Sequence, residues 1–346
     1  MALPASGQQI SADQISDEFG RNATGNSMSL GDYRLTQSVG SLSFNGIDSG
    51  VPTSGEIKFS DFHGKRLNVV VDFHTGGQES RQNAKSRYNG NSVTVIGGFR
   101  GKKEAGSKIL IHVNKTIGSE KGDQSRVALR TGSWDSDVAL SVDVGSSGRL
   151  YGAGGDGGEG SDSFSDSGSN SATSGGNGTS ALGIEHEETA VNIQSGGRIR
   201  CGFGGGGGGS GARQVDRGAD RSACGGGGGG GAGLPAGNGG DRGRRRSGNE
   251  DEVTTGNDGS AAQLEENGEG GSGGNNADEA FGGSGGRGGD PDESPQGGNN
   301  GSPGDGSSAG SAGANGSAIR RSNGNIVVDI TNAGDLTGDT SATGVA

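Results

Sequence analysis

The stretch GEGGSGGNNADEAFGGSGGRGGDPDESPQGGNNGSPGDGSSAGSAGANG, residues 268–316, decides the fold, because nearly every third residue in it is glycine. A period of three residues is typical of the polyproline-II helix and of neither an α-helix nor a strand. Two solid glycine runs lie upstream, at residues 204–209 and 225–231. The positions in register are Gly268, Gly271, Gly274, Ala277, Ala280, Gly283, Gly286, Gly289, Asp292, Pro295, Gly298, Gly301, Gly304, Ser307, Gly310, Gly313 and Gly316.

Residues 201–316 cannot build an ordinary hydrophobic core. They contain 43 glycines and six large apolar residues, and each glycine costs roughly 0.5–1 kcal/mol more to order than alanine. Three interpretations remain: a disordered linker, a collagen triple helix, or glycine-rich polyproline-II helices packed backbone to backbone. Collagen requires far more proline than the six prolines of this chain. We favour packed helices, because solid glycine runs would be a costly way to make a linker.

Composition limits the remaining fold. The chain has 346 residues, but only 26% are hydrophobic and 4% aromatic, so we expect an elongated or backbone-packed molecule. No apolar stretch approaches the roughly 18–20 residues of a membrane span. The opening residues Met1–Pro4 lack the charged start and apolar run of a secretion signal. We therefore expect the product to stay in the cytoplasm until assembly or lysis.

Charge is distributed unevenly along the chain. The net charge of −12 argues against generic binding of nucleic acid. Residues 198–246 nevertheless carry nine arginines against three aspartates, whereas residues 250–306 carry thirteen carboxylates and one base, Arg287. Such runs are often solvated loops. In the alternative interpretation the arginines meet an anionic surface, and the acids pair with them or hold divalent cations.

Cys201 and Cys224 flank the first solid glycine run and the loop that follows it. If their Cα atoms come within disulfide range, the bond would close a loop of about twenty residues and contribute roughly 3 kcal/mol. The other interpretation is two small buried thiols within tight backbone packing.

A short phrase recurs in the first sixty-odd residues, at positions 10–15, 28–33 and 57–62. Each copy couples serine and aspartate to apolar residues, a pattern typical of a capped helical turn. Ser11 before Ala12–Phe19 is the best candidate for a short helix, and Gly20 ends it. We interpret the three copies as a small docking element.

Between residues 67 and 150 the pattern becomes β. Four runs rich in β-branched residues, at 67–73, 92–96, 108–113 and 138–144, are separated by turns rich in glycine, asparagine and serine. They predict a small sandwich-like domain, with Tyr88, Phe99, Trp134 and Tyr151 in its core or rim.

A second repeat, at residues 140–152, 191–202 and 328–338, joins a strand to a turn, an apolar residue and a final glycine. We expect these three copies to be β-turn-β connectors that brace the glycine bundle, the last of them closing the chain.

These residues together resemble bacteriophage tail-fibre and receptor-binding proteins. The opening MALPASGQQISADQISDEFG, the turns MSLGDY and IKFSDFHGK, and the stretch VGSSGRLYGAGGDGGEG are similar to phrases in that family. The solid glycine runs resemble the glycine motifs of polyglycine-sandwich adhesins at fibre tips. The resemblance implies a compact bundle of glycine-rich helices whose connecting loops touch the bacterial receptor, and fibres that are often trimers. The loops here are charged rather than aromatic, unlike those of the family.

Catalytic and metal motifs are missing from the sequence. The four histidines form neither HExxH nor a zinc spacing, and GxGxxG matches arise from glycine content alone. We expect no enzyme activity, no cofactor and no metal site.

The sequence therefore predicts a mainly β protein in four parts. Residues 1–66 form a virion-attachment segment, 67–150 a β-rich domain, 151–325 a polyglycine-II-like bundle with loops, and 326–346 a closing strand. The predicted function is a tail-fibre or tail-tip protein that recognises the host envelope. The alternative is a purely structural tail or connector protein. Expected partners are other tail proteins and a bacterial surface polysaccharide or outer-membrane component.

The loop SGARQVDRGADRSA, residues 210–223, lies between the solid glycine runs, where a bundle segment has to turn round. Its arginines recur every four residues, a spacing that would align them along a short helical turn. Arginine forks suit phosphate and carboxylate groups of polysaccharide. In the alternative interpretation they only pair with the downstream acids. The candidate receptor-binding residues are Arg213, Asp216, Arg217, Asp220, Arg221, Arg242, Arg244, Arg245 and Arg246, and the end of the bundle at which the last four emerge is left open.

Overall fold

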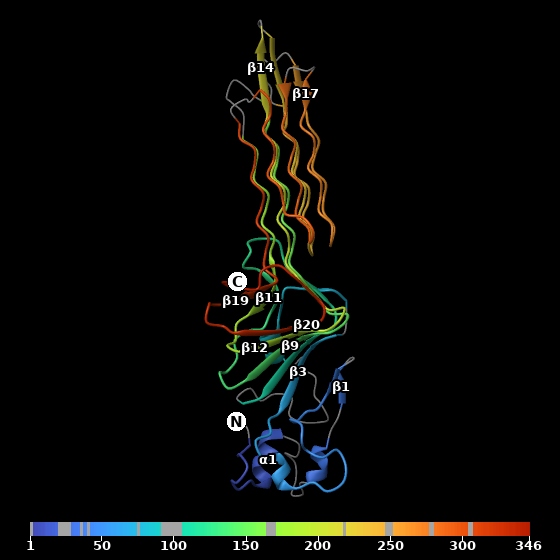
Figure 1. The fold of residues 1–346 in the computed structure, drawn as a ribbon, viewed down its shortest axis with the longest axis vertical. Helices are drawn as coiled ribbons and strands as arrows, with labels where there is room; N and C mark the ends of the chain where they lie inside the picture. The colour runs from blue at the N-terminus through green and yellow to red at the C-terminus, as the bar shows by residue number, and fades with distance from the viewer. Residues whose placement is uncertain are drawn as a thin grey trace.

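The computed structural model shows an elongated molecule, with the N-terminal helix at one end and glycine-rich segments at the other (Figure 1). The description covers residues 3–19, 29–34, 37–39, 42–74, 77–90, 106–163, 171–216, 219–245, 252–276, 280–303 and 307–346. Only the backbone is described for residues 37–39, 42–44, 216, 219, 220 and 252. The expected strand at 92–96 and the aromatic residue Phe99 lie outside the described residues.

The middle of the molecule is a coil of parallel strands that we call the coil domain. Successive strands pass from sheet 1 to sheet 2 to sheet 3 and back, so each sheet contains five strands paired in parallel. Sheet 1 consists of β3 (Asn68–Phe73), β6 (Lys108–Val113), β9 (Ala139–Val144), β12 (Thr189–Ile193) and β20 (Val328–Asn332). Sheet 2 consists of β4 (Glu79–Ser80), β7 (Thr116–Gly118), β10 (Arg149–Tyr151), β13 (Arg198–Arg200) and β21 (Asp335–Thr337). Sheet 3 consists of β5 (Gln82–Asn83), β8 (Val127–Arg130), β11 (Ser180–Ile184), β19 (Ile319–Arg321) and β22 (Ala342–Thr343).

Stacked apolar side chains hold the coil together. Val71, Ile111, Val142, Val191 and Ile330 lie in register across all five strands of sheet 1. The first four are buried, and the fifth packs against the same core. β-branched residues pack well on such pleated, buried surfaces. Each turn of the coil therefore buries an apolar row against the turn before it.

This topology differs from the expected sandwich-like domain of residues 67–150. The predicted strands at 67–73, 108–113 and 138–144 are present as β3, β6 and β9. They pair side by side in parallel within one sheet instead of facing one another across two sheets. Periodicity finds strands but does not say which strands pair, and strands from 180–200 and 319–343 complete the same coil.

The repeat at residues 140–152, 191–202 and 328–338 is a strand-turn-strand unit, as predicted. The three copies are β9–β10, β12–β13 and β20–β21, and each forms the corner between sheets 1 and 2 in a successive turn of the coil. Their similarity in sequence follows from that equivalence, because aligned strands need matching corners.

Glycine-rich segments leave the coil twice, each time between sheets 2 and 3. Residues 152–179 run from β10 to β11, and residues 201–318 run from β13 to β19. In the described part of the chain they form ten extended segments side by side, which we call the bundle (Figure 1). The segments are 152–163, 171–179, 201–211, 224–232, 237–245, 255–262, 268–274, 282–289, 296–303 and 307–317.

Two of these segments, 201–211 and 224–232, are central, and backbone hydrogen bonds link each of them to six neighbours. Gly225 donates to Ser161 and Gly228 donates to Gly158, both in one neighbouring segment. The two residues between them donate to two other segments. The backbone donors of a central segment therefore repeat with a period of three.

This arrangement explains the two glycine patterns of the sequence. A central segment has neighbours on every side, so a Cβ atom at Gly229 would lie far inside 3.0 Å of a neighbouring carbonyl oxygen. An outer segment has neighbours on one side only: Gly268 and Gly271 are buried, whereas Glu269 and Ser272 are exposed. Solid glycine runs thus mark the centre of the bundle, and interrupted runs mark its surface.

Backbone-to-backbone packing is therefore observed in the described glycine segments, and the linker interpretation does not hold for them. The hydrogen bonds define contacts between segments rather than the backbone angles within one. The assignment of each segment as a polyproline-II-type helix stays a prediction.

Two turns at the end of the bundle nearest the coil, at residues 233–236 and 263–267, contact the coil at sheet 2. The amide of Ser119 donates to the carbonyl of Leu234 at 3.0 Å. Glu265 accepts a hydrogen bond from the hydroxyl of Tyr151 at 3.4 Å and pairs with Arg200 at 3.1 Å. The bundle therefore stands on the coil through contacts from two of its turns.

The N-terminal part contains α1 (Ala12–Phe19), a 3₁₀ turn at Leu30–Tyr33, the hairpin β1–β2 (Gln37–Val39 and Leu42–Phe44) and a 3₁₀ turn at Phe59–Phe62. The predicted helix is confirmed, and Ser11 caps it by accepting from the amide of Gln14 at 3.2 Å. α2 (Ala84–Asn89) lies between the first two turns of the coil.

α1 and the two 3₁₀ turns, which overlap the three recurring phrases, pack against one another through aromatic residues. Phe19, Tyr33 and Phe62 are buried, with ring centroids 5.7–6.2 Å apart. The same core cluster continues through Leu67 into the coil. The N-terminal turns therefore have a core of their own, which sequence reasoning missed because its contacts join residues far apart in the chain.

Candidate functional site

The end of the bundle far from α1 carries short strands that we call the distal end (Figure 1). β14 (Ala212–Asp216) and β15 (Ala219–Ala223) form an antiparallel hairpin on the two central segments, and β16 (Glu252–Thr254) pairs with β15. β17 (Asn275–Asn276) and β18 (Ala280–Phe281) form a second pair beside them. Ala212, Ala223 and Ala280 form a small buried cluster at this end.

The loop at residues 210–223 reverses the chain as predicted, but it is not helical. Arg213 lies opposite Ser222, and Arg221 lies opposite Gln214. Neighbouring positions of a strand face opposite sides, so Arg213 and Arg221 belong to opposite faces of the hairpin. The expected alignment of arginines along one side is therefore wrong, because glycine runs on both sides favour a tight hairpin over a helical turn.

Several candidate residues are only partly described. Asp216 and Asp220 lie in β14 and β15, and only their backbone is described. Arg217 and Arg246 lie outside the described residues.

The second group of arginines ends at the same end of the bundle as the hairpin. Segment 237–245 runs beside segment 152–163, and the amide of Ser163 donates to the carbonyl of Arg244 at 3.1 Å. The amide of Gly243 donates to the carbonyl of Gly225, which lies two residues after the end of β15. The open question of the sequence is thereby answered: Arg242, Arg244 and Arg245 approach the distal end.

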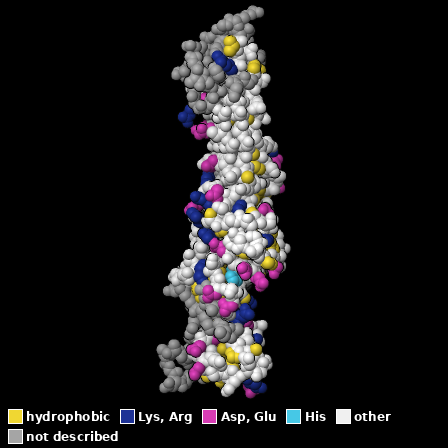
Figure 2. Space-filling view, turned by 90° about the vertical axis from the view of Figure 1, so that its left-hand side faces the viewer, with side chains coloured by type: hydrophobic (Ala, Val, Ile, Leu, Met, Phe, Trp, Pro, Cys, Tyr) yellow, Lys and Arg dark blue, Asp and Glu magenta, His cyan; other side chains and the backbone are white. Residues whose placement is uncertain are grey.

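The exposed arginines have acidic neighbours. Arg242 lies 3.9 Å from Asp258, and Arg244 lies 3.7 Å from Asp241. All four side chains are exposed, so each pair contributes about 0–1 kcal/mol at most. Figure 2 shows acidic and basic side chains mixed along one side of the molecule. Pairing with acids is therefore observed at these two arginines, and it leaves them exposed to solvent.

Sequence reasoning missed two apolar side chains at the distal end. Val215 is 63% exposed at the hairpin, and Phe281 is 39% exposed on β18. Phe281 is the sole aromatic residue between positions 204 and 316, which is the signal that could have drawn attention to it. The distal end therefore offers apolar as well as charged groups.

The candidate disulfide does not form, and the side chains of Cys201 and Cys224 are both buried thiols. Cys201 begins one central segment and Cys224 begins the other, and the two segments run in opposite directions, so the thiols lie at opposite ends of the bundle. Burial raises the pKa of the Cys201 thiol to about 12. The thiols act as small buried side chains, which was the second interpretation of the sequence.

A polar cluster lies on sheet 1, within strands that are otherwise apolar. The Nδ1 atom of His112 lies 3.1 Å from Asp143, and the amide of Gln194 donates to the same carboxylate at 2.9 Å. Burial alone would raise the pKa of Asp143. Hydrogen bonds from His112, Asn192 and Gln194 outweigh burial and hold that pKa below its usual value.

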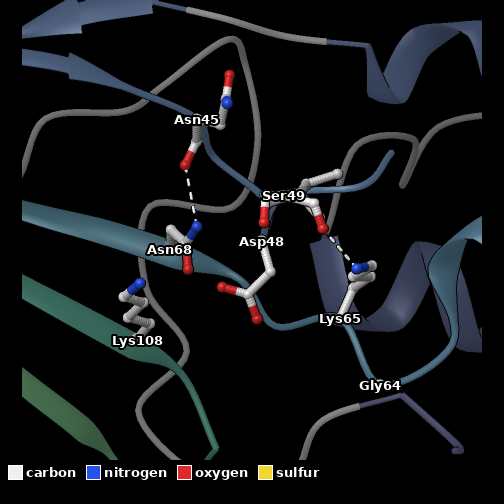
Figure 3. A pocket seen from close by; sticks show the side chains of 8 residues that line it. Asn45, Asp48, Ser49, Gly64, Lys65, Asn68 and Lys108 are labelled. Atoms are coloured by element: carbon white, nitrogen blue, oxygen red, sulfur yellow. Dashed lines mark hydrogen bonds between the residues drawn. The ribbon is translucent and has the colours of Figure 1, made fainter. Parts of the chain in front are cut away.

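A polar cavity of about 360 Å³ lies between the N-terminal part and the coil. Figure 3 shows Asn68 donating its side-chain amide to the carbonyl of Asn45, and Lys65 donating to the carbonyl of Ser49. The side chains of Asp48 and Lys108 also line this cavity. In the described part of the chain, no cluster of three metal-ligating side chains is found. The helices of that part are all too short and too polar to cross a membrane.

Comparison with known proteins identifies the family. Residues 80–341 match the family model described as phage tail fibre adhesin Gp38. The match covers most of the chain, and the chain belongs to this family. It is therefore a component of the virion tail that recognises the host bacterium, and the resemblance inferred from the sequence is confirmed.

One solved structure is similar to the chain in fold. The chain is similar to one in the crystal structure of the gp37–gp38 adhesin tip complex of the bacteriophage S16 long tail fibre, at 17% sequence identity and a TM-score of 0.35. That similarity covers 84% of this chain and 89% of the other. No curated protein matches the chain.

Proposed function

We propose that the distal end of the bundle is the part of this adhesin that contacts the host envelope. The observation that carries the proposal is geometric: the hairpin, β16, β18 and the exposed arginines gather at the end opposite the N-terminal part (Figure 1). Packed glycine segments place connecting loops at a fixed end without constraining their sequence. A purely structural connector would not need an end with exposed charged side chains.

The ligand class follows from the exposed groups. Arg242 and Arg244 have their guanidinium groups exposed beside single carboxylates. Arginine forks bind phosphate and carboxylate groups in bidentate fashion. Interleaved acids weaken binding to unrelated polyanions. We propose anionic groups of envelope polysaccharide as the ligand, and several fibres engaging at once would raise avidity without a high affinity for each loop.

The experiment compares adsorption of virions carrying Arg213, Arg217 and Arg221 all changed to Ser with wild type, at low and raised salt. Slower adsorption with a weaker salt dependence is expected, because the lost contacts are screened by ions. A matched variant removes three coil arginines, Arg81, Arg126 and Arg149, and should adsorb normally. Unchanged adsorption of the first variant would remove the hairpin from the receptor site.

We further propose that residues 1–66 attach the adhesin to another tail protein. The N-terminal part lies at the opposite end from the hairpin and exposes a large apolar side chain, Phe59, which is 41% accessible. The S16 structure holds gp38 together with gp37 in one complex. Exposed aromatic residues are frequent anchors of protein interfaces. A trimeric assembly, suggested by the resemblance alone, stays a prediction.

Removing residues 1–66 should abolish incorporation into virions. Because those residues share a core with the coil, a milder variant makes the sharper test. Phe59→Ser should lower the amount of adhesin per virion, whereas Val327→Ser, which changes an exposed apolar side chain of the coil, should not. Normal incorporation of both variants would contradict the proposal.

A further inference from the structure

Among dipeptides that begin with asparagine, asparagine followed by glycine loses its side-chain amide most readily. Glycine has no side chain to hinder attack by its own amide nitrogen on the asparagine side chain. The chain contains eight such pairs. The asparagines are Asn45, Asn89, Asn177, Asn238, Asn267, Asn300, Asn315 and Asn323.

In five of the eight pairs the glycine amide is already held in a hydrogen bond. The amides of Gly178, Gly268 and Gly316 donate to carbonyl groups of neighbouring bundle segments at 2.8–2.9 Å. Gly90 donates to a carbonyl within α2 at 2.9 Å, and Gly301 donates to the hydroxyl of Ser210 at 2.8 Å. A nitrogen fixed in this way cannot turn towards the side chain before it.

Two more pairs are restrained by packing. Gly46 is buried, and its carbonyl accepts from the amide of Asn68 at 2.9 Å. Gly239 lies so close to a neighbouring segment that a Cβ atom there would come far inside 3.0 Å of the carbonyl oxygen of Gly259. Neither backbone has room for the rotation that ring closure needs.

The eighth pair has neither restraint on its glycine. Asn323 and Gly324 lie in the turn between β19 and β20, and both are exposed. A Cβ atom built on Gly324 would meet no atom within 4 Å, and within the described residues no hydrogen bond from its amide is found. The amide of Asn325 donates to the side-chain oxygen of Asn323 at 2.9 Å. That donor would stabilise negative charge developing on the same oxygen during attack.

We propose that Asn323 is a site of spontaneous deamidation in this protein, and that the bundle protects its own asparagines. The nitrogen of Gly324 loses its proton and bonds to Cγ of Asn323, the Cγ–Nδ2 bond breaks, and ammonia leaves. Water then opens the cyclic imide at either carbonyl, giving aspartate or isoaspartate. Each event adds one negative charge to the coil, away from the distal end, and isoaspartate routes the chain through an additional methylene group.

The test is peptide mapping by mass spectrometry of the full-length protein after incubation in mildly alkaline buffer at physiological temperature. Loss of ammonia and conversion to the acid should appear first in the peptide containing Asn323, with isoaspartate as the major product. Gly324→Ala should slow the conversion by about tenfold or more, and the change should not disturb the fold because the position is open and its φ is not positive.

Two outcomes would overturn the proposal. One is conversion of Asn177, Asn267 or Asn315 at a rate equal to that of Asn323, since the same bundle hydrogen bonds would then offer no protection. The other is an Asn323 that stays intact while unfolded peptide of the same sequence converts. A matching rate in the folded protein and in that free peptide would support the absence of restraint at this turn.

Discussion

In the coil domain, side chains from three sheets fill the interior, whereas the interior of the bundle contains almost no side chains. The coil buries rows such as Val71, Ile111 and Val142, and its free energy of folding comes largely from apolar burial. In the bundle, each pair of neighbouring backbones is joined by hydrogen bonds that recur at every third residue. A chain with little apolar content can therefore still form a compact rod, provided that each inner position is glycine.

The difference also predicts which positions tolerate change. An apolar core accepts a substitution of similar volume at small cost. An inner glycine accepts no added atom, because carbonyl oxygens of the next segment already occupy the place of a Cβ atom. The outer faces and connecting turns of the bundle have no such restriction. The connecting loops can therefore change in sequence, whereas the inner glycines of the bundle cannot.

The largest effect is expected at an inner glycine. Gly286→Val would drive a side chain into the carbonyl oxygen of Gln296 and should lower the free energy of unfolding by about 3 kcal/mol or more. Ser284→Val, on the more open side of the same segment, should be tolerated. Thermal unfolding and protease resistance measure both. Equal values for the two variants would show that these segments are not packed.

A smaller loss is expected in the coil. Ile111→Ala removes a fully buried side chain and leaves a cavity, which should cost about 3 kcal/mol or slightly less. Ile111→Val should cost about 1 kcal/mol. Denaturant unfolding gives both values. A graded response to side-chain size in the coil, against an abrupt one at Gly286, would sharpen the comparison, and an abrupt response at both sites would erase it.

Next in size is the polar cluster on sheet 1. Asp143→Ala should cost about 1–3 kcal/mol, because Asn192 and Gln194 lose their acceptor. Since the folded-state pKa of Asp143 is below its ordinary value, the carboxylate stabilises the fold above the unfolded-state pKa of about 3.9. That contribution is lost as the pH falls through the folded-state pKa.

Melting temperatures measured across acidic pH test this expectation. The difference between wild type and Asp143→Asn should be largest near neutral pH and should shrink in acid. A difference that stays constant over the whole range would show that ionisation of Asp143 does not contribute.

The smallest effect is expected where the two regions meet. Glu265→Ala removes the ion pair with Arg200 and the hydrogen bond from Tyr151, and should cost at most about 1 kcal/mol because the site is partly exposed. Faster hydrogen exchange in the turn at residues 263–267 is the more sensitive measurement. Glu266→Ala is the matched control in the same turn. Equal exchange in both variants would mean that Glu265 does not fasten the bundle to the coil.

Part of this architecture could be predicted from residues alone. The helix at Ala12–Phe19 has a capping serine before it and glycine after it, and the strands β3, β6 and β9 are short runs rich in β-branched and other apolar residues. These are local signals, so they are readable without knowledge of distant contacts. The repeated corner sequences were also recognised, although as braces for the bundle rather than as equivalent turns of one coil.

The candidate site was predicted less completely. The hairpin between the glycine runs was expected as a reversal, but its strand geometry, which separates Arg213 from Arg221, depends on pairing between β14 and β15. The exposure of Val215 and Phe281 depends on how other segments pack around them. No local pattern encodes either property. The two cysteines show the same limit, because sequence spacing says nothing of the direction in which two segments run.

The sequence by itself determined that residues 268–316 have a period of three and that residues 201–316 have too few large apolar side chains for an ordinary core, because glycine content and periodicity are properties of the chain. Only the tertiary structure decided which glycine segments are central, which strands share a sheet, and which charged residues reach the distal end. The physical reason is that backbone hydrogen-bonding groups are identical at every residue. Glycine segments therefore carry almost no information about their partners, and the coil and the connecting loops fix the order in which they pack.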